Sequence, residues 1–159
     1  MRPTRHLYLP AMDRRVFVSA GVLGAAALAL SKRTDAAKWN EAERGSVKLV
    51  TDFCSVWSSR DMNKVLPFLA DDCVYRMTET TPPANGHEGV IQRLKTSVDN
   101  SSLVEFRILD TMAAGPIVIN HRVDRFLMTP PLTWEGVGVF FVKDGKIKEW
   151  SDYTIRVQR

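Results

Sequence analysis

The fold of this chain is decided by the stretch Asp144-Gly145-Lys146-Ile147-Lys148-Glu149-Trp150-Ser151-Asp152-Tyr153. Asp-Gly is among the strongest short signals for a hairpin, because the favoured two-residue turn needs a positive φ angle at both central residues. The turn joins two segments with strand-like alternation, at 132–143 and 146–156. The stretch therefore predicts that these segments pair as antiparallel strands.

On the N-terminal side of this hairpin, alternation predicts two more strands, at about 103–112 and 116–128. Helical spacing of apolar residues predicts one helix from Trp39 to Trp57 and another at about 87–98. The remaining segments are a short helix capped by Asp61, a turn at Asp71-Asp72, a strand at 73–78 and a loop at 80–86.

This order of elements indicates an α+β fold. We expect a curved sheet, mixed or antiparallel, that wraps around the N-terminal helices and forms a conical pocket on its concave face. About 122 residues follow position 37, which is enough for a single domain with one core.

The strand at 116–128 carries an unusual face. Asn120, Arg122 and Asp124 alternate along it and therefore point the same way. Val118 and Phe126 extend the same face with apolar side chains. A face that is apolar at both ends and polar between them is expected to line a cavity.

The first 37 residues predict a twin-arginine export signal. Arg14-Arg15 precede Phe17, and Ala36-Ala37 offer a cleavage site. The apolar run Val16–Leu30 is about 15 residues long, shorter than the ~20 that a membrane-spanning helix needs. We therefore expect a signal at 1–37, a single domain at 38–159 without stable membrane insertion after signal removal, and a periplasmic or secreted bacterial protein.

The positive charge of the chain belongs to this signal. The whole sequence has 22 Lys and Arg against 18 Asp and Glu, a net charge of +4, and residues 1–37 hold six basic and two acidic residues. The domain at 38–159 is therefore balanced, which removes the electrostatic support for nucleic-acid binding.

A metal site is not indicated by the sequence. Cys54 and Cys73 are the only cysteines, and they are expected to be buried thiols on separate elements. His6, His87 and His121 show no spacing typical of metal ligands.

Four stretches resemble the limonene epoxide hydrolase family, within the nuclear-transport-factor-like superfamily of cone folds that includes SnoaL-like and ketosteroid-isomerase-like proteins. Cone folds in general often carry an Asp-Gly-Lys-Ile hairpin followed by a Trp strand. The Arg-x-Asp motif ahead of that hairpin makes the resemblance specific to the hydrolases. The four stretches are Val74-Tyr75, Thr81-Pro82-Pro83-Ala84-Asn85-Gly86, Arg122-Val123-Asp124, and the segment from Gly138-Val139-Phe140 to Trp150-Ser151-Asp152-Tyr153.

The resemblance implies a role for each matching residue. Arg122 would bridge two carboxylates, with Asp124 as the general acid on the epoxide oxygen. Asp152 would be the general base on the attacking water, which Tyr75 would help to hold. The resemblance also implies a reaction without cofactor, a small apolar epoxide as substrate, a vicinal diol as product and a homodimer built on the outer sheet face, with Ile119, Val123 and Phe141 as candidates for its surface.

One position departs from the family. The family usually has Asn two residues after the Tyr, as a further ligand of the water, whereas this chain has Met77. Met offers only a weak acceptor. Asn120 is a candidate to supply the missing amide from another direction. We expect the substrate to contact Met77, Asn120, Phe126, Trp150 and Val118.

Alternatives remain open from the residues themselves. Arg-x-Asp on a strand also occurs as an ordinary cross-strand ion pair on a solvated face. An alternative function to the hydrolase is that of a binding module, which carries an apolar small molecule and keeps the charged residues for structure. A third is an isomerase or cyclase, like the ketosteroid isomerases and polyketide cyclases of the same fold, with one carboxylate base and no attacking water.

Overall fold

The computed structural model describes residues 39–158, so the export signal predicted at 1–37 lies outside the described residues. Within 39–158, no helix is long and apolar enough to cross a membrane. The elements are α2 (Glu41–Val56), η2 (Trp57–Ser59), α3 (Met62–Val65), η3 (Leu66–Phe68), β1 (Leu69–Arg76), β2 (Ala84–Asn85), α4 (Gly86–Asp99), β3 (Val104–Ala114), β4 (Ile117–Phe126), β5 (Leu132–Lys143) and β6 (Lys146–Gln158).

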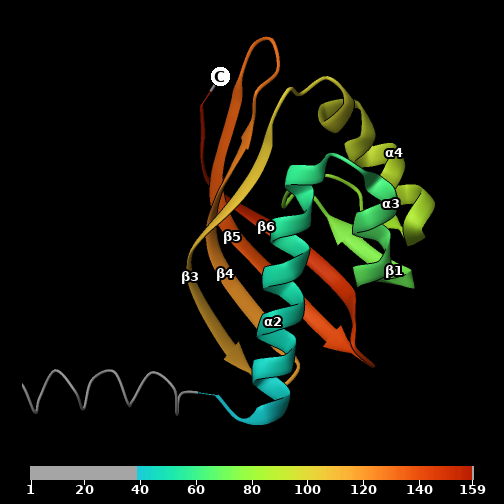
Figure 1. Ribbon diagram of the computed structural model, residues 1–159, viewed down its shortest axis with the longest axis vertical. Coiled ribbons are helices and arrows are strands. Elements are labelled where there is room, and N and C mark those ends of the chain that lie inside the picture. Colours follow the sequence, from blue (N-terminus) through green and yellow to red (C-terminus); the bar gives the residue numbers. More distant parts are fainter. Residues whose placement is uncertain (1–38, 159) are drawn as a thin grey trace, which may run out of the picture. The chain divides into compact units, whose positions relative to one another are not determined.

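The strands form one open six-stranded sheet in the order β2-β1-β6-β5-β4-β3. β1 and β6 pair in parallel, and every other neighbouring pair is antiparallel, so the sheet is mixed. Figure 1 shows the strongly twisted sheet with α2 running across it and α3 and α4 grouped near β1. The predicted α+β fold with a curved sheet and N-terminal helices is confirmed.

The hairpin predicted at Asp144-Gly145 forms between β5 and β6. Asp144 and Gly145 have φ angles of 51° and 70°, the positive values that a tight two-residue turn requires. β5 and β6 then pair from Lys143 opposite Lys146 to Thr133 opposite Gln158, with bulges between Phe141 and Val142 and between Glu135 and Gly136. This pairing places Asp152 directly across from Gly138.

Helix α2 supplies the helical side of the core. Asn40 and Glu43 form a reciprocal capping box at its start, with the Asn40 Oδ1 accepting from the Glu43 N–H at 2.9 Å. Phe53, on the buried face of α2, meets four aromatic rings edge-on at centroid distances from 5.0 to 6.2 Å, those of Trp57, Phe68, Phe140 and Trp150. The helix therefore packs onto the concave face of the sheet through aromatic contacts.

Two local predictions were wrong. Asp71 and Asp72 are not a turn, because β1 begins at Leu69 and a bulge between Leu69 and Val74 lets both acidic side chains face solvent. The segment at 80–86 is not all loop, since Ala84–Asn85 pairs with Val74 and Tyr75 as the short strand β2. In both places pairing with a neighbouring strand outweighs the local turn chemistry.

Candidate functional site

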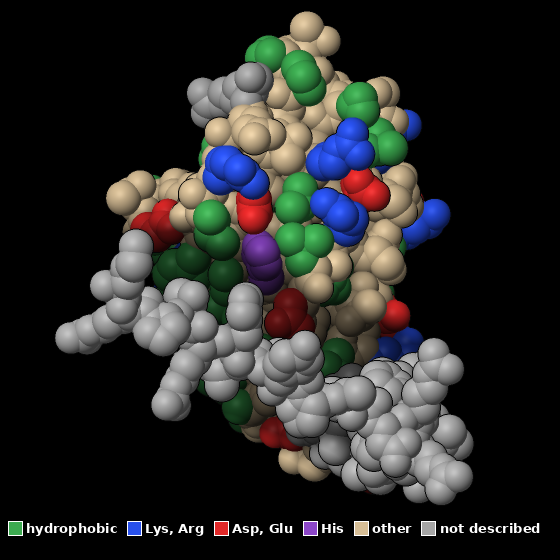
Figure 2. Space-filling model, turned by 90° about the vertical axis from the view of Figure 1, so that its left-hand side faces the viewer, with side chains coloured by type: hydrophobic (Ala, Val, Ile, Leu, Met, Phe, Trp, Pro, Cys, Tyr) green, Lys and Arg blue, Asp and Glu red, His purple; other side chains and the backbone are tan. Residues whose placement is uncertain are grey.

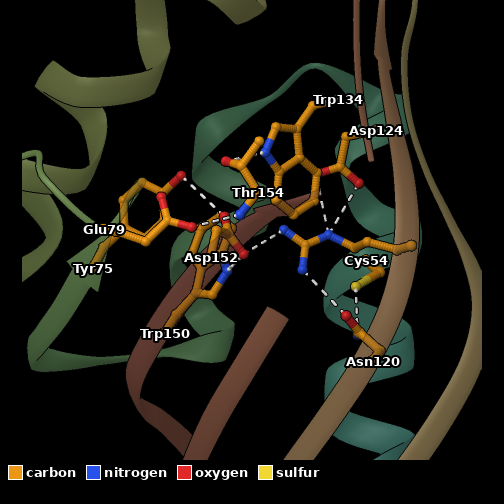
Figure 3. A network of polar contacts seen from close by, with 10 residues as sticks. Cys54, Tyr75, Glu79, Asn120, Asp124, Trp134, Trp150, Asp152 and Thr154 are labelled. Carbon is orange, nitrogen blue, oxygen red and sulfur yellow. Dashed lines mark hydrogen bonds and ion pairs between the residues drawn. The ribbon is translucent and has the colours of Figure 1, made fainter. Parts of the chain in front are cut away.

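Arg122 lies at the centre of the concave face of β4 with none of its surface exposed. Its Nε donates to both oxygens of Asp124 at 3.0 and 3.1 Å, and its Nη2 donates to Asp152 Oδ1 at 2.7 Å. The third arm, Nη1, donates to Asn120 Oδ1 at 3.2 Å (Figure 3). One guanidinium therefore joins two carboxylates and an amide, using the fixed fork of donors that only arginine offers.

The two carboxylates differ in their hydrogen bonds. Asp152 Oδ1 accepts from Arg122 and, at 2.7 Å, from Trp150 Nε1, while its Oδ2 accepts from the Tyr75 hydroxyl at 3.3 Å. Asp124 accepts only from the Nε of Arg122 among the described residues. Donors favour the charged form of a carboxylate, so Asp152 is the better place for the negative charge and Asp124 for a proton.

The pKa values follow from burial. Burial raises the pKa of Asp124 to about 7, although Arg122 opposes the shift. Burial also raises the pKa of Asp152, against the opposing effects of Arg122, Trp150 and Tyr75. One guanidinium balances only one carboxylate, so the buried group is neutral when the pair holds a single proton.

Aromatic rings enclose the guanidinium. Its Cζ lies 4.9 Å from the centroid of Trp134 and 5.3 Å from that of Phe106, with Phe140 and Trp150 each at 5.8 Å. These rings attract the cation through their faces and exclude water. Electrostatic interactions within such an enclosure are stronger than they would be in water.

Two glycines on β5 make room for these groups. Gly138 lies between Asn120 on β4 and Asp152 on β6, and a Cβ built there would overlap Arg122 Nη1. Gly136 is the inward-facing residue of β5 that precedes Gly138, and a Cβ at Gly136 would overlap the Trp134 indole. A side chain at either position would occupy the space that the site fills.

A cavity of about 100 Å³ opens against this network. Of the predicted site residues, it is lined by Tyr75, Asp124, Asp152, Met77 and Phe126. Asp124 and Asp152 reach it together, so both carboxylates of the Arg122 network can contact one bound molecule. The other lining residues are Leu94, Ser97, Phe106, Leu132 and Trp134.

Residues 50–150 match the family described as the SnoaL-like domain. This chain belongs to the SnoaL-like domain family. Similar solved structures include an LEH-like epoxide hydrolase of M. tuberculosis, which is 26% identical, covers 70% of this chain and 84% of its own, and superposes with a TM-score of 0.62.

Two further solved structures share the fold of this SnoaL-like domain. A putative polyketide cyclase of Xanthomonas campestris pv. campestris is 18% identical, with coverage of 71% of this chain and 92% of its own and a TM-score of 0.60. A protein of Catenulispora acidiphila with a ketosteroid isomerase-like fold is 17% identical, with coverage of 66% and 83% and a TM-score of 0.59. At these identities the likeness shows the fold alone.

Four predicted site residues lie behind the cavity of the SnoaL-like domain rather than on its lining: Arg122, Asn120, Val118 and Trp150. Both ends of the Asn120 amide are engaged, since its Nδ2 donates to Cys54 Sγ at 3.6 Å. Asn120 is therefore not placed to replace the amide that Met77 lacks. Trp150 stacks on Tyr75 at a centroid distance of 3.9 Å and donates to Asp152, so its place is that of a support for the carboxylate.

Sequence reasoning missed several residues of the site. Ser97 and Leu94 reach the cavity from α4, at positions where the sequence shows only helical periodicity. Gly136 and Gly138 did give a signal, because glycine inside a strand marks a close approach of other groups. Cys54 was expected to be a plain buried thiol, and it is buried and free on α2, but it also accepts the hydrogen bond from Asn120.

Within residues 39–158, no group of three or more His, Cys, Asp or Glu side chains is arranged to hold a metal ion. Among the lining residues of the cavity, the titratable groups are two carboxyl groups and one phenol. Burial raises the pKa of the Tyr75 hydroxyl well above its ordinary value, so Tyr75 acts as a hydrogen-bond donor.

We expect Gly138→Ala to displace Arg122, because the new methyl group would overlap Nη1. Separating the guanidinium from its buried partners costs roughly 3–5 kcal/mol of unfolding free energy. Chemical denaturation measures this loss. Gly45→Ala is the matched control, since Gly45 is exposed on α2 with no atom within 4 Å of the added Cβ, and this change should stabilise the helix. Equal stabilities for the two variants would contradict the requirement for glycine at 138.

The raised pKa of Asp124 makes the stability of the domain depend on pH. An unfolded chain ionises this group near ~3.9, whereas the folded chain keeps the proton to about 7. The stability that protonated Asp124 contributes is therefore complete below pH ~4 and is lost as the pH rises to about 7. Asp124→Asn stays neutral, so its Tm relative to wild type should increase between pH 4 and pH 8 in thermal melts. A relative Tm that decreases over this range would show that Asp124 is stabilised as the ion.

Proposed function

We propose that this SnoaL-like domain is a cofactor-independent epoxide hydrolase that opens a small apolar epoxide to a vicinal diol. The observation that carries the proposal is the pair of unequally hydrogen-bonded carboxylates, joined by buried Arg122, on a largely apolar cavity. The similarity to a structure named as an LEH-like epoxide hydrolase supports this reaction class.

Asp152 would act as the general base. Among the described residues, its Oδ2 accepts only from the Tyr75 hydroxyl, so it can also accept from a water molecule that enters the cavity. Tyr75 stays protonated and would help to orient that water. As the water oxygen attacks a ring carbon, its proton passes to Asp152. The second proton of the water remains as the new hydroxyl hydrogen.

Asp124 would act as the general acid. The C–O bond of the epoxide breaks as the water attacks, and Asp124 gives its proton to the departing ring oxygen. A carboxyl pKa of about 7 keeps that proton available near neutral pH. After product release, Asp152 loses one proton and Asp124 regains one, which restores the starting state. Each positioned proton transfer contributes about 10²–10⁴-fold in rate.

Met77 supports a second candidate, a non-catalytic pocket that binds a small apolar molecule. Met77 lines the cavity where the hydrolase family usually offers an amide, and the Asn120 amide is occupied by Arg122 and Cys54. An isomerase or cyclase has less support, because a single carboxylate base does not need a second carboxylate tied to the same guanidinium.

The test is diol formation by purified protein on a panel of epoxides of increasing size. Wild type should turn over at least one, and both Asp152→Asn and Asp124→Asn should lose about 10²-fold or more of kcat. Asp110→Asn, an exposed carboxylate of β3, is the matched control and should retain activity. The kcat of wild type should fall above pH ~7, where Asp124 loses its proton.

Two results would contradict the hydrolase proposal, and a third would contradict the role of Asp152. Binding of epoxides without turnover by folded wild type would favour the binding module. Rearrangement of a substrate without incorporation of labelled water oxygen would favour an isomerase or cyclase. Diol formation that survives Asp152→Asn would place the base elsewhere.

A homodimer through the outer sheet face is a further part of this proposal. Met112 and Tyr153 are 59% and 49% exposed on this face, and Ile119, Val123 and Phe141 are half-buried there. Figure 2 shows apolar side chains among basic and acidic ones on the side of the molecule that carries β3 and β4. Sedimentation velocity should find a dimer for wild type and a monomer for Val123→Lys. A monomeric wild-type protein would contradict the proposed homodimer.

Export through the twin-arginine pathway also stays a proposal, supported by Arg14-Arg15 and the apolar run after them. Fractionation of bacterial cells should find the wild-type protein outside the cytoplasm and an Arg14→Lys, Arg15→Lys double variant within it. An unchanged distribution would argue against the signal.

A further inference from the structure

The third arm of Arg122 enters a hydrogen-bond chain that the proposed chemistry does not use. Nη1 donates to Asn120 Oδ1 at 3.2 Å, and Asn120 Nδ2 donates to Cys54 Sγ at 3.6 Å. Asn120 is 1% and Cys54 2% exposed, and neither lines the cavity. Figure 3 shows Asn120 and Cys54 on the side of the guanidinium away from Asp152.

The orientation of the Asn120 amide is dictated by its neighbours. A guanidinium has only donors, so the amide must present its oxygen to Arg122. The amide nitrogen then points toward α2, where Cys54 Sγ is the acceptor. Without an acceptor there, a buried N–H would lose its hydrogen bond at a cost of roughly 1–3 kcal/mol.

We propose that Asn120 and Cys54 are positioning residues that hold the guanidinium of Arg122 in contact with both carboxylates. The contacts to Asp124 and Asp152 lie along one edge of the guanidinium, through Nε and Nη2. These two contacts hold one edge of the guanidinium. The third contact, on Nη1, holds the opposite side and links α2 to the acid–base pair on the sheet.

The neutrality of this anchor matters as much as its geometry. Burial raises the pKa of the Cys54 thiol to about 12, so the sulfur is uncharged and does not compete with Asp124 and Asp152 for Arg122. A carboxylate in place of Asn120 would add a negative charge and call for a second proton in the pair. An amide backed by a thiol holds Arg122 and leaves the one-proton state intact.

Four cysteine variants separate the hydrogen bond from simple packing. Cys54→Ala removes the acceptor and leaves a cavity, whereas Cys54→Val removes the acceptor and largely fills the space. Cys54→Ser keeps an acceptor at the same position. Cys73→Ala is the matched control. Cys73 is an equally buried free thiol on β1, and it takes no part in the Arg122–Asn120–Cys54 hydrogen bonds.

Two readouts are taken on each variant. The ¹⁵N–¹H NMR signals of the Arg122 side chain report directly whether its Nη groups are held, since immobilised groups rotate slowly and give separate signals. Steady-state diol formation gives kcat and KM, and this second readout alone rests on the proposed function.

We expect Cys54→Ala and Cys54→Val to merge or broaden the Nη signals and to lower kcat by about tenfold, with KM changed less than about twofold. Cys54→Ser should recover separate Nη signals and most of the lost kcat. Cys73→Ala should match wild type in both readouts.

The positioning role is overturned if separate Nη signals persist in both Cys54→Ala and Cys54→Val. A variant that fails to fold is covered by the other, because Cys54→Ala leaves space at this buried position and Cys54→Val fills it. Merged Nη signals in a protein without any epoxide turnover would leave the positioning role standing and reject the hydrolase. Merged signals with unchanged kcat would overturn the catalytic consequence of the positioning.

Discussion

The structure depends on burying one guanidinium. Arg122 is removed from water completely, which is strongly unfavourable unless every donor arm finds an acceptor. Two carboxylates and an amide meet that need, and aromatic rings close around them. The same requirement explains the absence of side chains at Gly136 and Gly138, since β5 must leave space between β4 and β6 for the guanidinium and the Trp134 indole.

Burial of this ion also sets the chemistry. One positive charge with two carboxylates favours a single retained proton, and the unequal hydrogen bonds direct it to Asp124. The site therefore holds a base and an acid at once, both facing the same small cavity. A general acid and a general base within one apolar space are what the opening of an epoxide by water requires. The reactivity that we propose therefore follows from the way that the fold accommodates the buried Arg122 side chain.

Much of this arrangement could be predicted from the sequence. The period of two along β4 placed Val118, Asn120, Arg122, Asp124 and Phe126 on one inward face, and all five are buried. The Asp144-Gly145 turn predicts that β5 pairs with β6, and a bulge between Phe141 and Val142 then sets the register that brings Asp152 opposite Gly138 and beside Arg122. The predictions that were wrong depend on the distance of a side chain from the cavity and on the pairing of strands far apart in the sequence. A pattern of residue types encodes neither. Alternation assigns a face but not a distance from the cavity, so it predicts Asn120 and Trp150 as substrate contacts although both lie one layer behind the cavity lining. Asp71-Asp72 has turn composition, yet the parallel pairing of β1 with β6 draws it into a bulged strand.

The proposed chemistry requires that the Asp124–Asp152 pair carries one proton near neutral pH and that Asp124 holds it. The most direct measurement is a ¹³C NMR titration of the two side-chain carboxyl carbons, assigned with Asp124→Asn and Asp152→Asn. We predict that the Asp124 signal changes from the protonated to the ionised position at about pH 7, while Asp152 is already ionised at that pH. Two ionised carboxylates throughout pH 5–8, or a proton held by Asp152 in place of Asp124, would contradict it.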